Sequence, residues 1–407
     1  MVRTVRTVLK RDPATVSEQA ALPLLPVGPV AVEFFAGIGL ARMGLERAGF
    51  RVAWSNDIEP AKHDMYASHF QDPEGIHTFT LGDVTNVGGS DMPEDISLAW
   101  ASSPCVDVSL AGARAGMQGK RSATFYQFTR VIKELPEDAR PEVVTLENVV
   151  GLATSHGGAD LTAAIKELNG LGYSVDVLTL DARWFVPQSR PRLFLVGARH
   201  APADHPGANP NLRPSWLSEP FADARLRTHR ALLPEIVEPP NNTLTSVIET
   251  MPRDDARWWD TKRTAAFEAS LSPVQAARLE KLRAANQIVH RTAYRRTRKG
   301  VPMWEIRTDN IAGCLRTARG GSSKQAVVEV GRKTLRVRWM TDLEYARLMG
   351  AGDYRLPTKL SSNQALFGFG DAVCVPTVEW LASNYLMPLA NGTFGELQES
   401  SLVAIGA

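Results

Sequence analysis

EFFAGIGLARMG, residues 33–44, begins as an apolar run, passes two closely spaced glycines and continues with the spacing of a helix. An apolar run that ends in glycine predicts a strand, and the residues that follow predict an amphipathic helix that stops at Gly49. Gly37 and Gly39 permit a tight turn and the close approach of a ligand. A dinucleotide site would have a third glycine where this chain has Arg42, so the turn does not favour a cofactor with a pyrophosphate.

The same alternation of strand and helix continues through the first 200 residues. Further strands are predicted at FRVAWSND (50–57), HTFTLGD (77–83), DISLAWASS (95–103), EVVTLENV (142–149), YSVDVLTLD (173–181) and RLFLVGAR (192–199). Between several of them lie helical patterns such as ATFYQFTRVIKEL (123–135) and ADLTAAIKELNGLG (159–172). Repeated strand and helix units predict an α/β fold with a doubly wound, mostly parallel, Rossmann-like sheet, whose ligands bind at the carboxyl ends of the strands.

The pattern changes after Arg199 and predicts a second, smaller domain. Residues 201–255 are rich in proline and asparagine, which is typical of irregular structure. Ser272 has the character of a helix cap, because proline and a helical pattern follow it. Residues 340–354 and 367–386 then predict a helix and a strand that return to the main body.

The composition indicates a soluble protein. The chain has 407 residues, of which 44% are hydrophobic, and this is enough for a large core. No run of about 18 apolar residues is present, and the amino terminus lacks the apolar stretch of a signal peptide, so we expect a cytoplasmic protein. Cys105, Cys314 and Cys374 are widely spaced, so we expect neither a disulfide scaffold nor a metal.

The net charge of +2 conceals an asymmetry along the chain. Residues 290–338 contain thirteen Lys or Arg and three acidic residues, whereas the remainder carries 33 basic and 41 acidic residues. Such segregation is typical of a face that binds a polyanion on an otherwise acidic body. A solvated basic face or a flexible loop is the alternative explanation.

Acidic residues follow the second and third predicted strands. Asp57 ends WSND, twenty residues after Gly37, where a carboxylate can accept from ribose hydroxyls. Asp83 ends LGD, where it can meet an adenine edge. A glycine turn followed by these two acids indicates an adenosine-containing cofactor without a pyrophosphate. The alternative is that each acid caps a helix or turn.

A cysteine and a carboxyl follow the next two strands, in Pro104-Cys105 and Glu147-Asn148. Strand ends of one sheet lie close together, so the thiol and the carboxyl are expected to face one pocket. A thiolate can add to carbon 6 of a pyrimidine when an acid protonates ring nitrogen 3, and the adduct makes carbon 5 nucleophilic. Gln188, Arg190 and Arg192 come next and are candidates to orient the base or its phosphate, or are solvated or structural.

These motifs resemble those of a known family. FFAGIG, SPCVDVS, ENV and QSRPR, followed near the end by RWMTDLEYARLMG and GFGDAVCVPTVEWL, are similar in order and separation to the motifs of bacterial or phage DNA cytosine-5 methyltransferases. The resemblance covers residues 31–199 and 310–388. It implies a loosely ordered extension at 1–30, a catalytic domain at 31–199, a target-recognition region at 200–335, a return to the catalytic domain at 336–390, and a tail at 391–407.

The resemblance implies a role for each matching residue. Cys105 would be the nucleophile, Glu147 the acid on ring nitrogen 3, and Arg190 a residue that holds the cytosine, with Gln188 and Arg192 beside it. S-adenosylmethionine would be the cofactor, with Phe35 stacked on its adenine. The other residues implied at the cofactor are Ala36, Gly37, Ile38, Gly39, Asp57, Ile58, Asp83, Val84, Pro104, Asp371, Ala372 and Val373.

Duplex DNA would be the substrate, held by Ser109, Arg114, Arg316, Arg319 and Lys324. Residues 108–121, with three glycines, would form a lid that closes over a cytosine flipped out of the helix. A restriction endonuclease or other defence proteins would be the partners of a monomeric enzyme.

Two positions depart from the family pattern. Ser103 stands where a second proline usually precedes the cysteine, and Asp371 stands where the last motif usually has Asn. An aspartate there would repel the carboxylate of the cofactor unless a cation or its own protonation relieves the repulsion. We therefore expect altered cofactor binding, which an Asp371→Asn variant of unchanged affinity would contradict.

The sequence thus predicts an S-adenosylmethionine-dependent DNA cytosine-5 methyltransferase. An enzyme that acts on RNA cytosine is the alternative within the family, and a variable region with a basic stretch favours duplex DNA. A nucleotide-binding oxidoreductase would explain the fold but gives Cys105 and Glu147 no role. A DNA-binding relic without turnover would not be expected to keep both of these residues.

Overall fold

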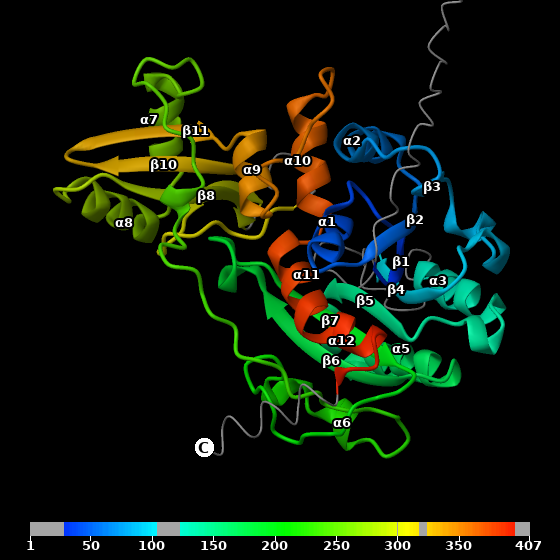
Figure 1. Cartoon of the computed structure of the whole chain (residues 1–407). Coiled ribbons are helices and arrows are strands. Elements are labelled where there is room, and N and C mark those ends of the chain that lie inside the picture. Colours follow the sequence, from blue (N-terminus) through cyan, green and yellow to red (C-terminus); the bar gives the residue numbers. More distant parts are fainter. Residues whose placement is uncertain (1–27, 104–122, 299, 317–323, 395–407) are drawn as a thin grey trace, which may run out of the picture.

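The computed structural model describes residues 28–103, 123–298, 300–316 and 324–394. Two sheets dominate this part of the chain, a large one built mainly from the first 200 residues and a smaller one built from residues after 288 (Figure 1). Helices cover both faces of the large sheet, which confirms the predicted α/β class.

Seven strands form the large sheet, in the order β3-β2-β1-β4-β5-β7-β6. They are β1 (Val30–Phe34), β2 (Arg51–Asp57), β3 (Thr78–Leu81), β4 (Ile96–Ser102), β5 (Val143–Val149), β6 (Ser174–Asp181) and β7 (Pro191–Ala198). The first five pair in parallel, and β7 runs antiparallel to both β5 and β6. The order reverses between β1 and β4, and such a switch point is where ligands bind in this class of sheet.

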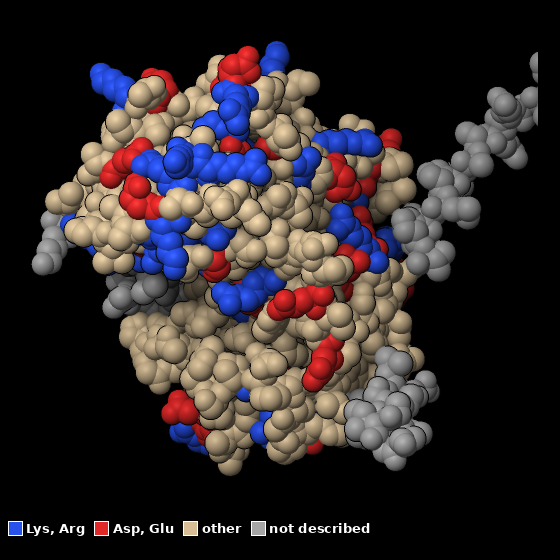
Figure 2. Space-filling model, turned by 90° about the vertical axis from the view of Figure 1, so that its left-hand side faces the viewer, with Lys and Arg blue, Asp and Glu red and all other residues tan. Residues whose placement is uncertain are grey.

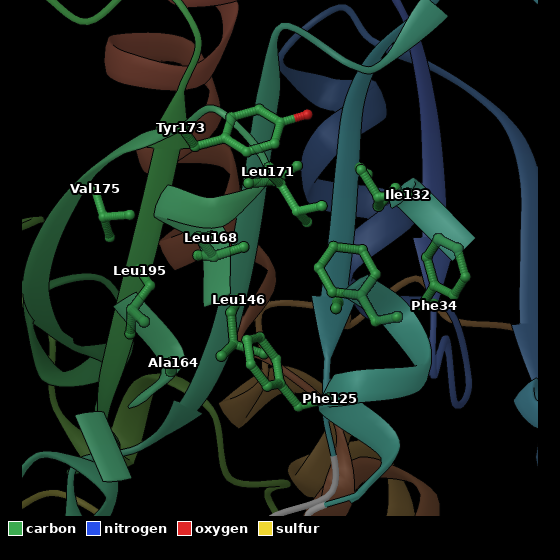
Figure 3. Close-up of a cluster of buried hydrophobic side chains, with 14 of the residues drawn as sticks. Phe34, Phe125, Ile132, Leu146, Ala164, Leu168, Leu171, Tyr173, Val175 and Leu195 are labelled. Carbon is green, nitrogen blue, oxygen red and sulfur yellow. The ribbon is translucent and has the colours of Figure 1, made fainter. Parts of the chain in front are cut away.

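The two faces of the sheet are buried by different helices, because neighbouring strand residues point to opposite sides. One face packs against α3 (Ala123–Glu134) and α5 (Ala159–Gly170), and Figure 3 shows Phe125, Ile132, Ala164 and Leu168 of these helices against Phe34, Leu146 and Leu195. The other face packs against α1 (Leu40–Arg47), α11 (Val375–Leu381) and α12 (Met387–Ala390). The sheet is therefore doubly wound.

The strand predicted within residues 367–386 is wrong, because this stretch is helical. It contains the end of α10 (Ser362–Asp371), then α11 and a π-type turn that leads into α12. Val375, Val378 and Leu381 recur at helical spacing. Val378 and Leu381 are buried against the large sheet, and Val375 is buried in a neighbouring cluster with Leu40 and Met43 of α1. The stretch Ser362–Ala390 is apolar and long enough to cross a membrane, but 67% of its apolar window is buried inside the protein, as in a core helix.

The smaller sheet is antiparallel throughout, with strand order β11-β10-β8-β9. Its strands are β8 (Val289–Arg298), β9 (Val301–Ile306), β10 (Gln325–Gly331) and β11 (Thr334–Trp339), and its helices are α7 (Thr261–Ala269) and α8 (Pro273–Arg283). Phe267, Leu279 and Trp304 are among the residues of a separate core between them. The predicted cap is confirmed, because the Ser272 side chain accepts from the N–H of Gln275.

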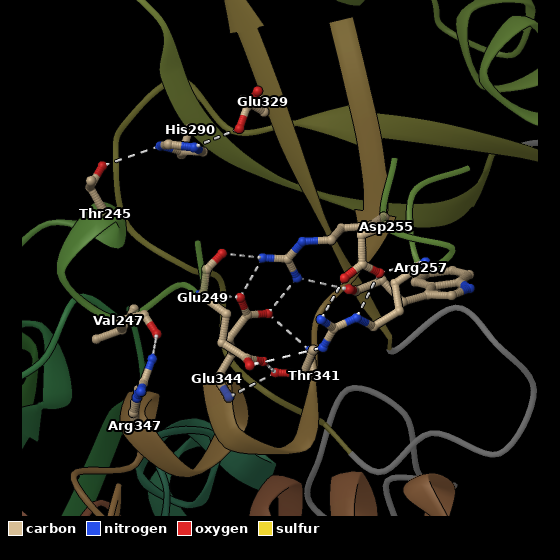
Figure 4. A network of polar contacts seen from close by, with 12 residues as sticks. Thr245, Val247, Glu249, Asp255, Arg257, His290, Glu329, Thr341, Glu344 and Arg347 are labelled. Carbon is tan, nitrogen blue, oxygen red and sulfur yellow. Dashed lines mark hydrogen bonds and ion pairs between the residues drawn. The ribbon is translucent and has the colours of Figure 1, made fainter. Parts of the chain in front are cut away.

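A buried ion pair fixes the smaller sheet to α9 (Asp342–Leu348). Arg338 on β11 donates to both carboxylate oxygens of Glu344, at 2.8 and 2.5 Å. The same carboxylate accepts from the backbone N–H groups of Glu249 and Thr341 (Figure 4). The segment around Glu249 and the stretch 338–344, which are distant in sequence, therefore meet at a single carboxylate.

Candidate active site

The glycine turn after β1 lies at the switch point of the large sheet. Phe35, Gly37 and Gly39 all have a positive φ, and Phe35 (φ 58°) is a non-glycine residue in this strained region. A Cβ on Gly39 would lie 2.4 Å from the ring of Phe70, so this position has no room for a side chain. Gly37 is open, and a Cβ there would meet only Lys62 within 4 Å. The turn thus leaves its backbone accessible on one side.

Asp57, at the end of β2, holds the turn in place. One carboxylate oxygen accepts from the N–H of Gly37 at 2.8 Å, and the other accepts from the N–H of Glu59 at 2.9 Å. A carboxylate has about four acceptor sites, so this bracing leaves lone pairs for a ligand. Contact between Asp57 and a ribose stays a prediction. The structure adds a second role for Asp57, which is to brace the glycine turn.

Exposed apolar side chains stand at the ends of β2 and β3. Ile58 is 57% exposed and Leu81 is 45% exposed, although both are aliphatic. Asp57, the residue before Ile58, pairs with Leu81 across these strands. Ile58 and Leu81 therefore lie at the same edge of the sheet. Asp83 follows as an exposed residue whose carboxylate accepts from the N–H of Thr85. Side chains of this kind form a platform for a flat base with an acceptor beside it.

Other residues predicted at the cofactor are largely internal. The side chains of Ile38, Val84 and Val373 are buried in hydrophobic clusters, and Ala36 is also buried. Any contact from the three clustered residues would therefore come from their backbone. Pro104 and Cys105 lie outside the described residues, as do Ser109, Arg114 and Arg319.

Arg42, which replaces the third glycine of a dinucleotide turn, organises a polar network under the turn. Its guanidinium donates to both oxygens of Asp72 at 2.7 and 2.6 Å and lies over the ring of Phe70. Tyr66 connects this group to the rest of the network, which comprises Glu33, Ser55 and His77. The arginine thus supports the helix that follows the turn.

Stability should fall as the pH rises from 6.5 to 8. Burial raises the pKa of Glu33 to about 8, so the folded protein keeps a proton that the unfolded chain releases near 4.5. Burial also lowers the pKa of His77 to about 4, which adds an opposite slope only below 6.5. Of the groups in this network, Glu33 is the one that loses its proton between pH 6.5 and 8, and its contribution amounts to about 2 kcal/mol.

Urea unfolding at several pH values checks this expectation. A Glu33→Gln variant cannot release a proton, so its stability should decline less between pH 6.5 and 8 than that of the wild type. Equal slopes in the two proteins would contradict the assignment of the proton to Glu33.

Glu147 lies at the end of β5, beside the strand that leads to Cys105. Its neighbour across the parallel pair is Ser102, the last residue of β4. The carboxyl is buried and forms an ion pair with the Nε of Arg192 at 2.9 Å. Burial raises the pKa of Glu147, against the opposing effect of Arg192 and Arg190. The site therefore favours a protonated carboxyl more than water does.

Arg190 and Gln188 are bound to backbone rather than directed at open space. Arg190 is buried and donates to the carbonyl oxygens of Leu315, Gly370 and Ala372 at 2.8, 3.1 and 2.5 Å. Gln188 is fully buried between the carbonyl of Leu348 and the N–H of Leu315. This geometry favours a bracing role for both residues over direct contact with a base.

Cys314 lies among these arginines. Its Sγ is 3.5 Å from the Nη1 of Arg190. Burial opposes ionisation of the thiol, but Arg190, Arg192 and Arg316 outweigh it and lower the pKa of Cys314. The candidate site therefore contains a buried thiol that is polarised by neighbouring arginines.

Asp371, at the end of α10, forms an ion pair with a lysine, which is the kind of cation expected to offset its charge. The Nζ of Lys62, on α2 (Pro60–Phe70), lies 3.0 Å from its carboxylate. Burial opposes the charge on Lys62, but Asp371, Asp57 and Glu59 outweigh it and raise the pKa of the lysine. The repulsion expected from the sequence is thus offset by an ion pair.

Basic residues gather over the smaller sheet (Figure 2). Several arginines of the 290–338 segment form ion pairs with acidic residues of the same chain. The pairs are Arg307–Asp309, Arg336–Glu329, Arg338–Glu344 and Arg298–Glu305. Arg295 and Arg316 are exposed and Lys324 is half-buried. The charge available to a polyanion is therefore smaller than the net charge of the segment.

The model of the family described as C-5 cytosine-specific DNA methylase matches residues 30–386. The chain belongs to this family. Type II methyltransferase M.BanI of Aneurinibacillus aneurinilyticus is 35% identical over 175 residues, which cover 41% of this chain and 37% of that protein. Type II methyltransferase M.HhaI of Haemophilus parahaemolyticus is 29% identical over 171 residues, which cover 42% and 49%. The chain thus spans less than two thirds of the length of these curated relatives.

The fold is also shared with a solved structure. The Dnmt2 methyltransferase of S. pombe has a TM-score of 0.57 at 16% identity, over 89% of this chain and 99% of that one. The likeness extends over both sheets, because little of either chain is left unmatched.

C-5 cytosine methyltransferases use S-adenosylmethionine as methyl donor, and the residues around the glycine turn fit this molecule. Ile58 and Leu81 offer an apolar platform for adenine, and Asp57 has acceptor sites left for hydroxyls. Gly37 is open on the side that a ligand would approach. Arg42 is buried and already paired with Asp72, so its guanidinium is not available to a pyrophosphate. This agrees with a cofactor that has no pyrophosphate.

Sequence reasoning missed three residues of this region. Lys62 and Cys314 gain their meaning from partners far away in sequence, and no local pattern marks them. Leu81 was inside a predicted strand, and the glycine that follows it was a signal that the strand ends there.

Proposed function

We propose that this family member transfers the methyl group of S-adenosylmethionine to carbon 5 of a cytosine flipped out of duplex DNA, through a covalent adduct with Cys105. The arrangement of Glu147 carries the proposal. It is a buried carboxyl with a raised pKa, paired with Arg192 on the strand next to the one that leads to Cys105. Neither a binding module nor an oxidoreductase needs an acid of this kind here.

Each protein group has a defined step. The Cys105 thiolate forms a bond to carbon 6 while Glu147 delivers a proton to ring nitrogen 3, which makes carbon 5 nucleophilic. Bound S-adenosylmethionine supplies an electron-poor methyl group. Carbon 5 would form a bond to this methyl group as the methyl–sulfur bond breaks, which leaves S-adenosylhomocysteine. A base then removes the proton of carbon 5, the bond to Cys105 breaks, and ring nitrogen 3 returns its proton to Glu147. Arg192 keeps the Glu147 carboxyl oriented towards the ring.

Duplex DNA is the proposed substrate. A thiol at a strand end cannot reach a base inside the double helix, so the target cytosine must be flipped out. The cost of flipping is a few kcal/mol, and contacts between phosphates and the exposed Arg295 and Arg316 would offset it. We place the enzyme in the cytoplasm as a monomer within a restriction-modification or phage-defence system, with any endonuclease on a separate chain.

Transfer of a labelled methyl group tests the proposal. Wild-type protein should label cytosine in unmethylated duplex DNA, and a Cys105→Ala variant should label none, because no adduct forms without the thiol. Label in single-stranded RNA alone would establish the RNA enzyme instead. Protein that binds DNA but labels neither nucleic acid would be the relic without turnover.

A further inference from the structure

Ser103, which stands where the family pattern has a second proline before the cysteine, has a side-chain partner in the folded protein. Its Oγ lies 3.1 Å from the Oγ1 of Thr124, the second residue of α3, so the two hydroxyls share a hydrogen bond. Ser103 is only 6% exposed, so water competes little for this bond. The two residues stand on either side of segment 104–122, which contains Cys105 and lies outside the described residues.

The bond attaches Ser103 to a firmly packed part of the protein. Phe125 and Phe128, which follow on α3, are 2% and 1% exposed in the core that covers one face of the large sheet. A second attachment comes from Asn148, whose Nδ2 donates to the carbonyl oxygen of Ser103 at 3.4 Å. Ser103 is therefore tied both to α3 and to the residue that follows Glu147 on β5.

These contacts do what a proline ring would do at this position. A proline fixes its own φ and thereby restricts the chain that follows it. A serine leaves this angle free, and a free backbone costs conformational entropy when the reaction requires one geometry. Hydrogen bonds from the side chain and the carbonyl of Ser103 restrain the same residue from outside its backbone.

We propose that the hydrogen bond between Ser103 and Thr124 positions the Cys105 segment for attack on carbon 6 of cytosine, an inference that rests on the proposed function. Cys105 follows only two residues after Ser103, so the place of Ser103 limits where the thiol can lie. The contact with Asn148 relates this place to the strand of Glu147. Such placement affects the rate strongly, since a displacement of about 1 Å can slow a reaction about 100-fold.

Single-turnover methyl transfer to duplex DNA tests the positioning role. Ser103→Ala removes the hydroxyl without supplying a ring, so the rate should fall about 5- to 50-fold. The KM for DNA and the affinity for S-adenosylhomocysteine should change less than about twofold, because neither ligand is held by this bond. Thr124→Val removes the partner hydroxyl at similar size and should cause the same loss of rate. Ser103→Ala/Thr124→Val should lose no more than either single variant, since all three lack one and the same bond.

Two rescue variants separate positioning from a general effect on the fold. Ser103→Pro restrains the backbone in the way of the family pattern and should stay within about twofold of the wild-type rate. In Ser103→Pro/Thr124→Val the second change should then have no effect. Thr124→Ser keeps the hydroxyl and should keep the rate, which carries the comparison if Ser103→Ala does not fold.

Thr129→Val is the matched control on the same helix. Thr129 is buried, and its hydroxyl contacts Glu167 at 3.0 Å instead of the Cys105 segment. This variant should transfer methyl groups at the wild-type rate. An equal loss in Thr129→Val, a wild-type rate in Thr124→Val, or a double variant whose loss multiplies the two single losses would overturn the positioning role alone. A wild type that transfers no methyl group would overturn the proposed function and this inference with it.

Discussion

Methyl transfer by a Glu147→Gln variant should be slower than that of the wild type by about 100- to 10,000-fold. Glutamine has the shape of glutamate but cannot deliver a proton to ring nitrogen 3, so carbon 5 is no longer activated. Burial raises the pKa of Glu147, which favours the protonated carboxyl that this step needs. Single-turnover transfer to duplex DNA measures the effect, and binding of S-adenosylhomocysteine should stay unchanged because Glu147 faces Arg192 and not the glycine turn.

Glu142 offers a matched control for this variant. It lies beside the start of β5, at the opposite end of the strand, and its carboxylate binds His200. Glu142→Gln should transfer methyl groups at the wild-type rate, because its end of the strand is remote from the site. A Glu147→Gln variant that retained this rate would contradict the role of the acid.

Removing Arg338 should have the largest effect on stability, a loss of about 3–5 kcal/mol in the free energy of unfolding for Arg338→Ala. The side chains of Arg338 and Glu344 are only 1% and 0% exposed, so the variant leaves a buried carboxylate without its cation. The backbone N–H groups of Glu249 and Thr341 still donate to it but carry no full charge. Urea denaturation monitored by fluorescence measures the change.

Two comparisons show whether burial is the cause. Arg336→Ala, on the same strand, breaks the pair with Glu329, which is more exposed, and should cost about 1 kcal/mol or less. Arg338→Met combined with Glu344→Leu removes both charges and should recover much of the lost stability. Equal costs for the two single arginine variants would contradict the argument.

Local sequence determined the elements whose physical causes are local. Gly39 predicted a turn because a backbone with positive φ and no space for a Cβ requires glycine. Ser272 predicted a helix start because its hydroxyl accepts from an N–H three residues later. The strand predicted near residue 375 failed for a related reason: β-branched residues there favour a strand locally, but their spacing lets one helical face pack on the large sheet.

The order of motifs at strand ends also determined the family, since each motif needs only its own residues to be recognised. What the tertiary structure alone decided is which charges meet. Lys62 pairs with Asp371, Arg192 pairs with Glu147, and Arg190 donates to the carbonyl oxygens of Gly370 and Ala372 at the end of α10. Coulomb interactions and desolvation depend on distance in space and on burial, and neither is encoded by separation along the chain. Glu147 and the glycine turn could therefore be predicted from the sequence. Their partners and the pKa shift of Glu147 depend on how the sheet and its helices pack.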